Sequence, residues 1–254
     1  MIKEELVRTS NPALNPKVFD NYGSASMTGQ SIMTIQGTIN KIGMLLLLAF
    51  LAAAWSWILY LRGASASTMN LITFGGAIGG FIAALVTIFK KEWSPVSAPV
   101  YALLEGLLLG GISVVFNNSY PGIAFQAVFL TFATLLTMLF IYKTGIIKVT
   151  EKFRLGVFAA TGGIALFYFI SIILGFFGVN VPYVFGNGII GIGFSLLVVG
   201  IAALNLVLDF DFIESASQKN FPQYMEWYGA FGLMVTLVWL YLEILRLLAK
   251  LRDQ

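Results

Sequence analysis

The chain has 254 residues, of which 58% are apolar and 11% are charged, and its formal net charge is +3. Soluble domains carry about 25% charged residues, so this composition excludes an ordinary water-soluble globule, a disordered chain and a coiled coil, and it predicts a polytopic membrane protein. The chain has no cysteine and no histidine, which excludes disulfides, thiol chemistry and histidine-based catalysis or metal binding.

Residues 1–41 are predicted to form a polar leader in the cytoplasm. Charged residues such as Lys3, Glu4 and Arg8 interrupt this segment, and it lacks the apolar stretch that a secretory signal peptide requires. The rest of the chain, residues 42–254, is predicted to form one transmembrane domain.

Apolar segments follow one another along the rest of the chain. A helix needs about 20 mostly apolar residues to cross a bilayer, and seven segments meet this requirement. The loops between them are short, so spans that follow one another in sequence are expected to be neighbours in space. The predicted fold is an all-α, seven-transmembrane-helix bundle with spans at 42–61, 69–89, 98–116, 122–142, 155–178, 186–210 and 228–248.

The distribution of basic residues predicts how the bundle is oriented. Most lysines and arginines lie in the leader and in the loops after the second and fourth spans, which the positive-inside rule assigns to the cytoplasm. With seven crossings the C-terminus then lies outside. Arg246, Lys250 and Arg252 run against this last step, and a final segment that enters and returns is the alternative; seven crossings is the preferred interpretation. The basic residues flank spans and form no stripe interleaved with aromatics, so nucleic acid is not expected as a partner.

Glycines recur in the second, third and sixth spans at spacings that let helix backbones approach closely in lipid. We interpret them as packing positions of the bundle. They are Gly75, Gly76, Gly79 and Gly80, then Gly106 and Gly110, and finally Gly188, Gly191 and Gly193.

Acidic residues inside the spans are the candidate functional residues, because a carboxylate at the centre of a span costs about 2.5–3.5 kcal/mol. Glu105 lies in the third span, Asp209 at the end of the sixth and Glu243 in the seventh. Asp211 follows Asp209 by two residues and therefore faces another direction. Glu105 has no base within reach along its own helix, whereas Arg246 lies three residues from Glu243 and is placed for a local ion pair.

Carboxylates without histidine or cysteine suit hard cations such as Ca²⁺, Mg²⁺ or Na⁺, and also protons. Two carboxylates that share a buried site are expected to hold one proton and to titrate as a pair. The shared proton ties two helices together. Its loss leaves two negative charges that repel one another or recruit a cation, so such a pair forms a gate.

Three short motifs resemble those of the Bax inhibitor family, the transmembrane Bax-inhibitor-motif proteins. They are residues 208–213 (LDFDFI), 240–244 (LYLEI) and 105–110 (EGLLLG), and the leader residues 8–12 (RTSNP) look like a bacterial branch. The resemblance implies a pH-sensitive Ca²⁺ leak channel in a bacterial inner membrane, with Asp209 and Glu243 as an acid dyad that binds protons or Ca²⁺. It implies no enzymatic activity and no tightly bound cofactor; Ca²⁺ is the expected permeant ion.

Two alternatives stay open at the level of the sequence. Straight helices joined near residues 219–222 would place Glu243 about 15 Å deeper than Asp209, so the dyad requires an interfacial segment at 214–228; depth alone would pair Asp209 with Glu105. The second alternative concerns function: a membrane regulator that transports nothing and binds another membrane protein through the leader or the 211–228 region. An intramembrane aspartyl protease is disfavoured because the glycine-rich context of its aspartates is missing around Asp209.

Overall fold

The computed structural model describes residues 31–178 and 182–253, and the predicted leader lies mostly outside this part. The described residues form helices throughout and contain no β-strand, only one isolated bridge between Ile32 and Pro222. The long helices are α1 (Ile35–Leu61), α2 (Ala66–Phe89), α3 (Ser94–Ser119), α4 (Ile123–Lys143), α5 (Glu151–Phe176), α7 (Ile189–Gln218) and α8 (Tyr224–Arg252), and the short ones are η4 (Lys91–Trp93) and α6 (Pro182–Phe185).

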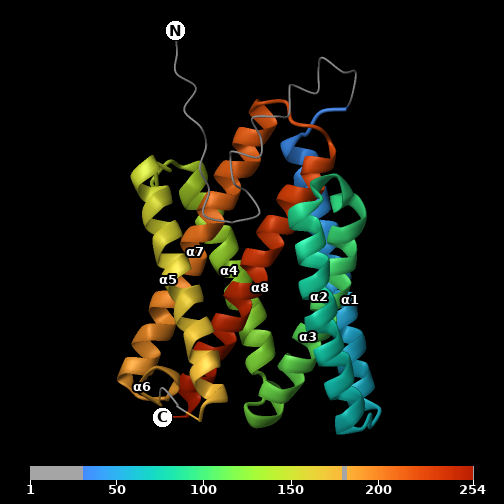
Figure 1. The fold of residues 1–254 in the computed structure, drawn as a ribbon, viewed down its shortest axis with the longest axis vertical. Helices are drawn as coiled ribbons and strands as arrows, with labels where there is room; N and C mark the ends of the chain where they lie inside the picture. The colour runs from blue at the N-terminus through green and yellow to red at the C-terminus, as the bar shows by residue number, and fades with distance from the viewer. Residues whose placement is uncertain (1–30, 179–181, 254) are drawn as a thin grey trace.

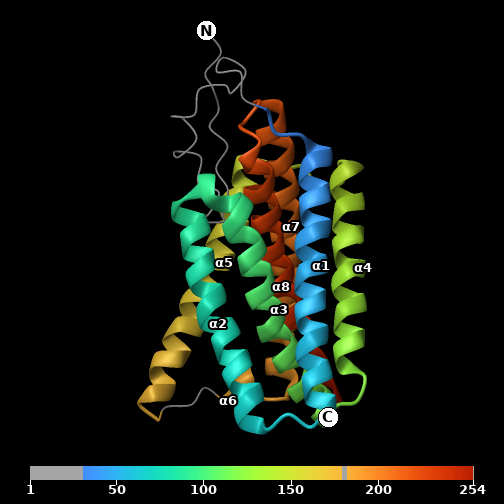
Figure 2. The same ribbon diagram turned by 90° about the vertical axis from the view of Figure 1, so that its right-hand side faces the viewer.

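The described residues contain seven helices that are long and apolar enough to cross a membrane. Large apolar side chains such as Leu71, Phe129, Phe140 and Phe176 point outward, which would be costly in water and is expected against lipid. The helices run side by side, and α1 begins at the opposite end from the C-terminus (Figure 1, Figure 2). The predicted all-α, seven-helix membrane bundle is therefore confirmed, and the re-entrant last segment is not observed.

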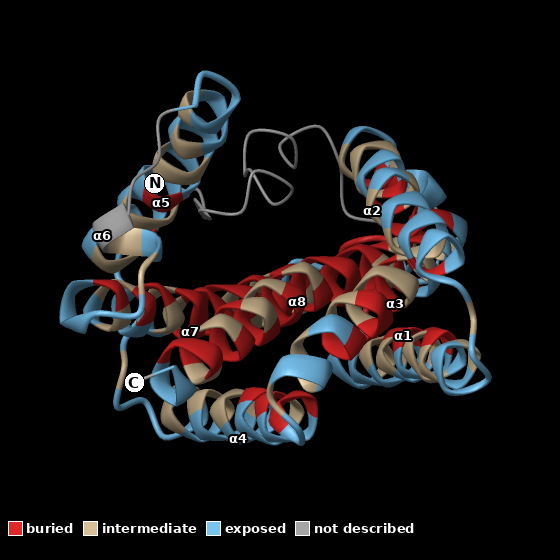
Figure 3. Cartoon of the chain, turned by 90° about the horizontal axis from the view of Figure 1, so that it is seen from below, coloured by how far each residue is buried: buried red, intermediate tan, exposed pale blue. Residues whose placement is uncertain are grey.

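Helix α8 forms the centre of the bundle. Most of its residues are buried, and it crosses the interior from the end where α1 begins, here called the near end, to the opposite or far end (Figure 1, Figure 3). Helix α5 lies at the margin beside α7, and only Val157 and Ile164 of its 26 residues are buried. The bundle is therefore unevenly packed, with a dense centre and one loosely held helix.

Glycines bring α3 close to its two neighbours. A Cβ atom on Gly76 of α2 would lie 2.6 Å from the backbone oxygen of Leu104, and one on Gly106 of α3 would lie 2.3 Å from that of Ala49 in α1. The predicted packing role of these glycines is confirmed. It does not extend to Gly75, Gly188 or Gly193, around which a Cβ would meet no atom within 4 Å.

The helices extend beyond the predicted spans. Helix α1 begins at Ile35 instead of 42, because the Thr34 side chain accepts the Gly37 N–H and caps a polar first turn. Helix α7 continues to Gln218 instead of 210, and α8 begins at Tyr224 instead of 228. The 214–228 region is thus not the interfacial segment that the acid dyad required; only residues 219–223 connect the two helices.

The near end is closed by a contact between the start of α1 and the start of α8. The Met33 N–H donates to Phe221 O at 2.7 Å. Glu226 of α8 is 2% exposed. Its carboxylate accepts from the Thr34 N–H at 2.9 Å and Oγ1 at 2.8 Å, and lies 2.8 Å from Lys41 Nζ. A carboxylate at a helix N-terminus also interacts favourably with the helix dipole, so Glu226 fastens α1 to α8.

Replacing Glu226 with alanine is expected to destabilise the protein by about 1–2 kcal/mol, because Lys41 and the Thr34 donors lose their acceptor. Unfolding of the purified protein in detergent measures this change. Glu92→Ala is the matched control, since Glu92 is exposed at the same end and should change stability by less than about 0.5 kcal/mol. Equal effects of the two substitutions would show that Glu226 is not a fastening residue.

The C-terminal bases have structural partners at the far end. Lys250 is 4% exposed and donates to Val184 O at 2.9 Å and Gly191 O at 3.0 Å. Arg252 donates to Pro121 O at 2.9 Å. The acceptor oxygens belong to α6, to the first turn of α7 and to the loop between α3 and α4. These contacts explain why basic residues stand at an end where the charge distribution does not favour them.

Candidate functional site

Polar side chains of α5, α7 and α8 meet along one line inside the bundle. Those of α5 recur every seven residues, and so do Thr236 and Glu243 of α8; seven residues are nearly two turns, so such residues share a helix face. We call this line the polar seam. It comprises Arg154, Thr161 and Tyr168 of α5, Asn205, Asp209 and Asp211 of α7, and Thr236, Glu243 and Arg246 of α8.

The near end of the seam is an ion pair between α5 and α7. Arg154 Nη2 lies 2.7 Å from Asp211 Oδ2, and Arg154 Nη1 lies 2.9 Å from Glu151 Oε1. The Asp211 side chain is 18% exposed and that of Arg154 is 13% exposed. Asp211 therefore faces α5, whereas Asp209, two residues earlier, faces α8, as the helical spacing predicts.

Asp209 is buried between α7 and α8. It is 2% exposed, and its Oδ2 accepts a hydrogen bond from Thr236 Oγ1 at 2.5 Å. One turn before Asp209 in α7, and so nearer the far end, Asn205 Nδ2 donates to Thr161 Oγ1 of α5 at 2.8 Å. Asp209 thus connects α7 to the central helix, and Asn205 connects α7 to the marginal one.

Glu243 lies further toward the far end. It is 2% exposed; Arg246 Nη1 donates to its two oxygens at 2.9 and 3.1 Å, and the Tyr168 hydroxyl donates to Oε1 at 3.0 Å. The Arg246 guanidinium also stacks over the Tyr168 ring, 5.2 Å from its centroid. The local ion pair expected from the three-residue spacing is confirmed.

The two acids of the expected dyad lie at different levels. Asp209 contacts Thr236, and Glu243 follows Thr236 by seven residues, which is about 10 Å along a helix. Their carboxylates consequently do not share one proton by direct contact in this arrangement. The cause is the short connection between α7 and α8, which leaves Glu243 deeper than Asp209.

Glu105 lies outside the seam. It is 8% exposed and packs against α2, where a Cβ on Gly80 would be 2.8 Å from Glu105 Oε2. Helix α8 lies between α3 and α7 (Figure 3), so the structure does not bring Glu105 to Asp209. Among the described residues, no three acidic side chains converge in a way that could hold a metal ion.

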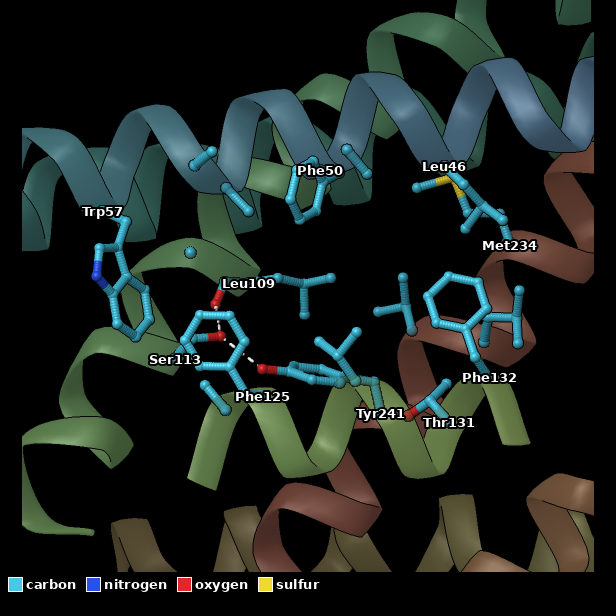
Figure 4. A pocket seen from close by; sticks show the side chains of 18 of the residues that line it. Leu46, Phe50, Trp57, Leu109, Ser113, Phe125, Thr131, Phe132, Met234 and Tyr241 are labelled. Carbon is cyan, nitrogen blue, oxygen red and sulfur yellow. Dashed lines mark hydrogen bonds between the residues drawn. The ribbon is translucent and has the colours of Figure 1, made fainter. Parts of the chain in front are cut away.

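A separate apolar groove of about 410 Å³ lies between α1 and α4, and residues of α3 and α8 also line it. Its walls include Phe50, Trp57 and Phe125. The Ser113 side chain, which donates to Leu109 O, lies 2.7 Å from the Tyr241 hydroxyl (Figure 4). Tyr241 and Glu243 are two residues apart and so face opposite sides of α8. The groove and the seam are therefore independent features.

Sequence reasoning missed the partners of the acids. Thr161, Tyr168 and Thr236 are ordinary polar residues within apolar spans, and a single residue of this kind carries no signal. Their seven-residue spacing from Arg154 and Glu243 is the pattern that was available in the sequence. It predicts a polar face on α5 and on α8 but does not say which helices face one another.

A family model described as Bax inhibitor 1 like matches residues 11–253 of the chain. No curated protein and no solved structure matches the chain. The matched range includes the three motifs on α3, α7 and α8 and all nine residues of the seam.

Proposed function

The chain belongs to the Bax inhibitor 1-like family, and on that premise we propose that it is a pH-sensitive leak channel for Ca²⁺ in a bacterial inner membrane, with its N-terminus in the cytoplasm. The observation that supports the proposal is the polar seam, in which Asp209 and Glu243 are each 2% exposed inside helices long and apolar enough to cross a membrane. Buried carboxylates are costly in a membrane and commonly mark ion or proton pathways.

The chemistry of the seam suits a hard cation. Ca²⁺ binds six to eight oxygen ligands in flexible geometry, and the seam offers carboxylate, hydroxyl and amide oxygens from Asp209, Thr236 and Asn205. These oxygens are spread over successive levels. Passage along a pathway requires several weak sites in place of one tight site, so the arrangement favours a permeant ion over a resident one.

The acids supply the pH dependence. In the described arrangement Arg246 balances the charge of Glu243, and Asp209 accepts the Thr236 hydroxyl, which fits a closed seam. Protonation removes the negative charge that attracts a cation, and deprotonation restores it. Flux is therefore expected to rise as pH rises, with Asp209 and Glu243 acting at two successive levels.

Ca²⁺ flux into liposomes that contain the purified protein tests this proposal. We expect the initial rate to increase from mildly acidic to mildly alkaline pH. Asp209→Asn cannot gain a charge at any pH, so its flux should stay low and flat, and Glu243→Gln should weaken the pH dependence. Glu105→Gln is the matched control, because it neutralises another buried acid, which lies outside the seam, and it should keep the wild-type profile.

A pH response that is unchanged in both Asp209→Asn and Glu243→Gln would remove the carboxylate gate. Folded protein that conducts nothing at any pH, and that co-purifies with one dominant membrane protein, would instead favour the alternative function of a membrane regulator that transports nothing.

A further inference from the structure

Apart from an aromatic contact in its far half, where the Phe167 ring lies 5.2 Å from that of Phe194 in α7, helix α5 is attached to the bundle by little apolar packing. Val157 and Ile164 are its only buried residues, and a Cβ built on Gly156, Gly162 or Gly163 would meet no atom within 4 Å. In lipid, helices associate through close packing and interhelical hydrogen bonds, because lipid is as apolar as the helices themselves. With so little packing, hydrogen bonds carry much of the attachment of α5.

Three polar side chains make these bonds, and they lie on one face of α5. Arg154, Thr161 and Tyr168 are each seven residues apart. They contact Asp211 at 2.7 Å, Asn205 at 2.8 Å and Glu243 at 3.0 Å. The three contacts extend from the near end of α5 to beyond its middle, about 21 Å of helix.

The same contacts keep the polar sides of α7 and α8 away from lipid. Without α5, Asn205 and the buried Glu243 carboxylate would face acyl chains, which offer no hydrogen bonds. The Arg246 side chain is 39% exposed even with α5 in place. Helix α5 thus covers the one line, among the described residues, along which three helices bring polar side chains together. A helix held by hydrogen bonds loses less interaction free energy when it separates into water than a helix held by apolar contacts. The reason is that water replaces the hydrogen bonds.

We propose that the cation pathway of this protein follows the α5–α7–α8 seam and that α5 is its gate. The pathway opens when α5 moves away from α7 and α8 and its three polar contacts are replaced by water. Its role in conduction rests on the proposed channel function, whereas the movement of α5 is measurable without flux.

A cross-link between α5 and α7 tests the gate, and the absence of native cysteines makes each introduced pair unique. The rings of Phe167 in α5 and Phe194 in α7 lie outside the polar seam, with centroids 5.2 Å apart. We expect Phe167→Cys/Phe194→Cys to conduct when reduced, to lose flux when bridged by a short bis-methanethiosulfonate, and to regain it with reductant. Thr87→Cys/Ser97→Cys is the matched control, since Thr87 Oγ1 lies 2.8 Å from Ser97 Oγ between α2 and α3. Its cross-link should leave flux unchanged.

Labelling of a single cysteine gives the readout that is independent of flux. Thr161→Cys is expected to react with a charged, membrane-impermeant methanethiosulfonate, faster at the pH that favours flux. Leu166→Cys, on the lipid side of α5 at 59% exposure, should not react.

Unchanged flux in the cross-linked α5–α7 pair, or block only by the α2–α3 pair, overturns the gate while the channel function stands. A protein without flux whose Thr161→Cys is still labelled overturns the channel function and leaves the movement of α5 supported; no labelling in such a protein overturns both.

Discussion

Replacing Arg246 with glutamine is expected to destabilise the protein by about 3 kcal/mol, because the substitution leaves the buried Glu243 carboxylate without its cation. Arg246 donates to both oxygens of that carboxylate and, at 2.8 Å, to the Tyr168 hydroxyl. Its loss therefore removes a charge and disturbs the tie to α5. Denaturant unfolding in detergent, followed by helix content, measures the change.

The double substitution Glu243→Gln/Arg246→Gln is expected to recover most of the lost stability, since no uncompensated charge then stays buried. Arg62→Gln is the control for loss of a cation, because Arg62 is exposed just after α1. An Arg246→Gln protein as stable as Arg62→Gln would mean that Glu243 does not depend on Arg246. A double variant no better than Arg246→Gln would assign the effect to Tyr168 and α5 instead of to the charge pair.

The helices of this protein were predictable because a bilayer demands long apolar segments, and the sequence shows each of them. The residues at which the helices begin and end were less predictable. The first turn of α1 and the last two turns of α7 are too polar to be assigned to a span from their composition. Caps and tertiary contacts, such as that of Thr34 with Glu226, stabilise such turns as helix. The same extension of α7 decides that Asp209 and Glu243 lie at different depths.

The local part of the candidate site followed from sequence spacing, and the long-range part did not. Glu243 and Arg246 pair because three residues separate them on one helix. The partners of Asp209 and Asp211 lie on α8 and α5, and their identity depends on how the helices rotate and which of them touch. Glu105 shows the same limit, since only the structure shows that it packs on Gly80.

Gly106→Ala is expected to destabilise the protein by about 3 kcal/mol, as the backbones of α1 and α3 leave no room for a methyl group. A Cβ on Gly106 would lie 2.3 Å from Ala49 O and 2.8 Å from Ala49 Cα. Both are backbone atoms, which cannot rotate away as a flexible side chain does. The α1–α3 contact must therefore separate, and it does so beside the central helix α8.

Gly162→Ala on α5 is the matched control, because the same methyl group there meets no atom within 4 Å. Alanine favours a helix over glycine by about 1 kcal/mol, so this variant should be as stable as the wild type or slightly more so. Unfolding of both variants in detergent separates the two cases. If Gly162→Ala were as damaging as Gly106→Ala, α5 would be tightly packed on its open side, and it could not act as a loosely held cover over the seam.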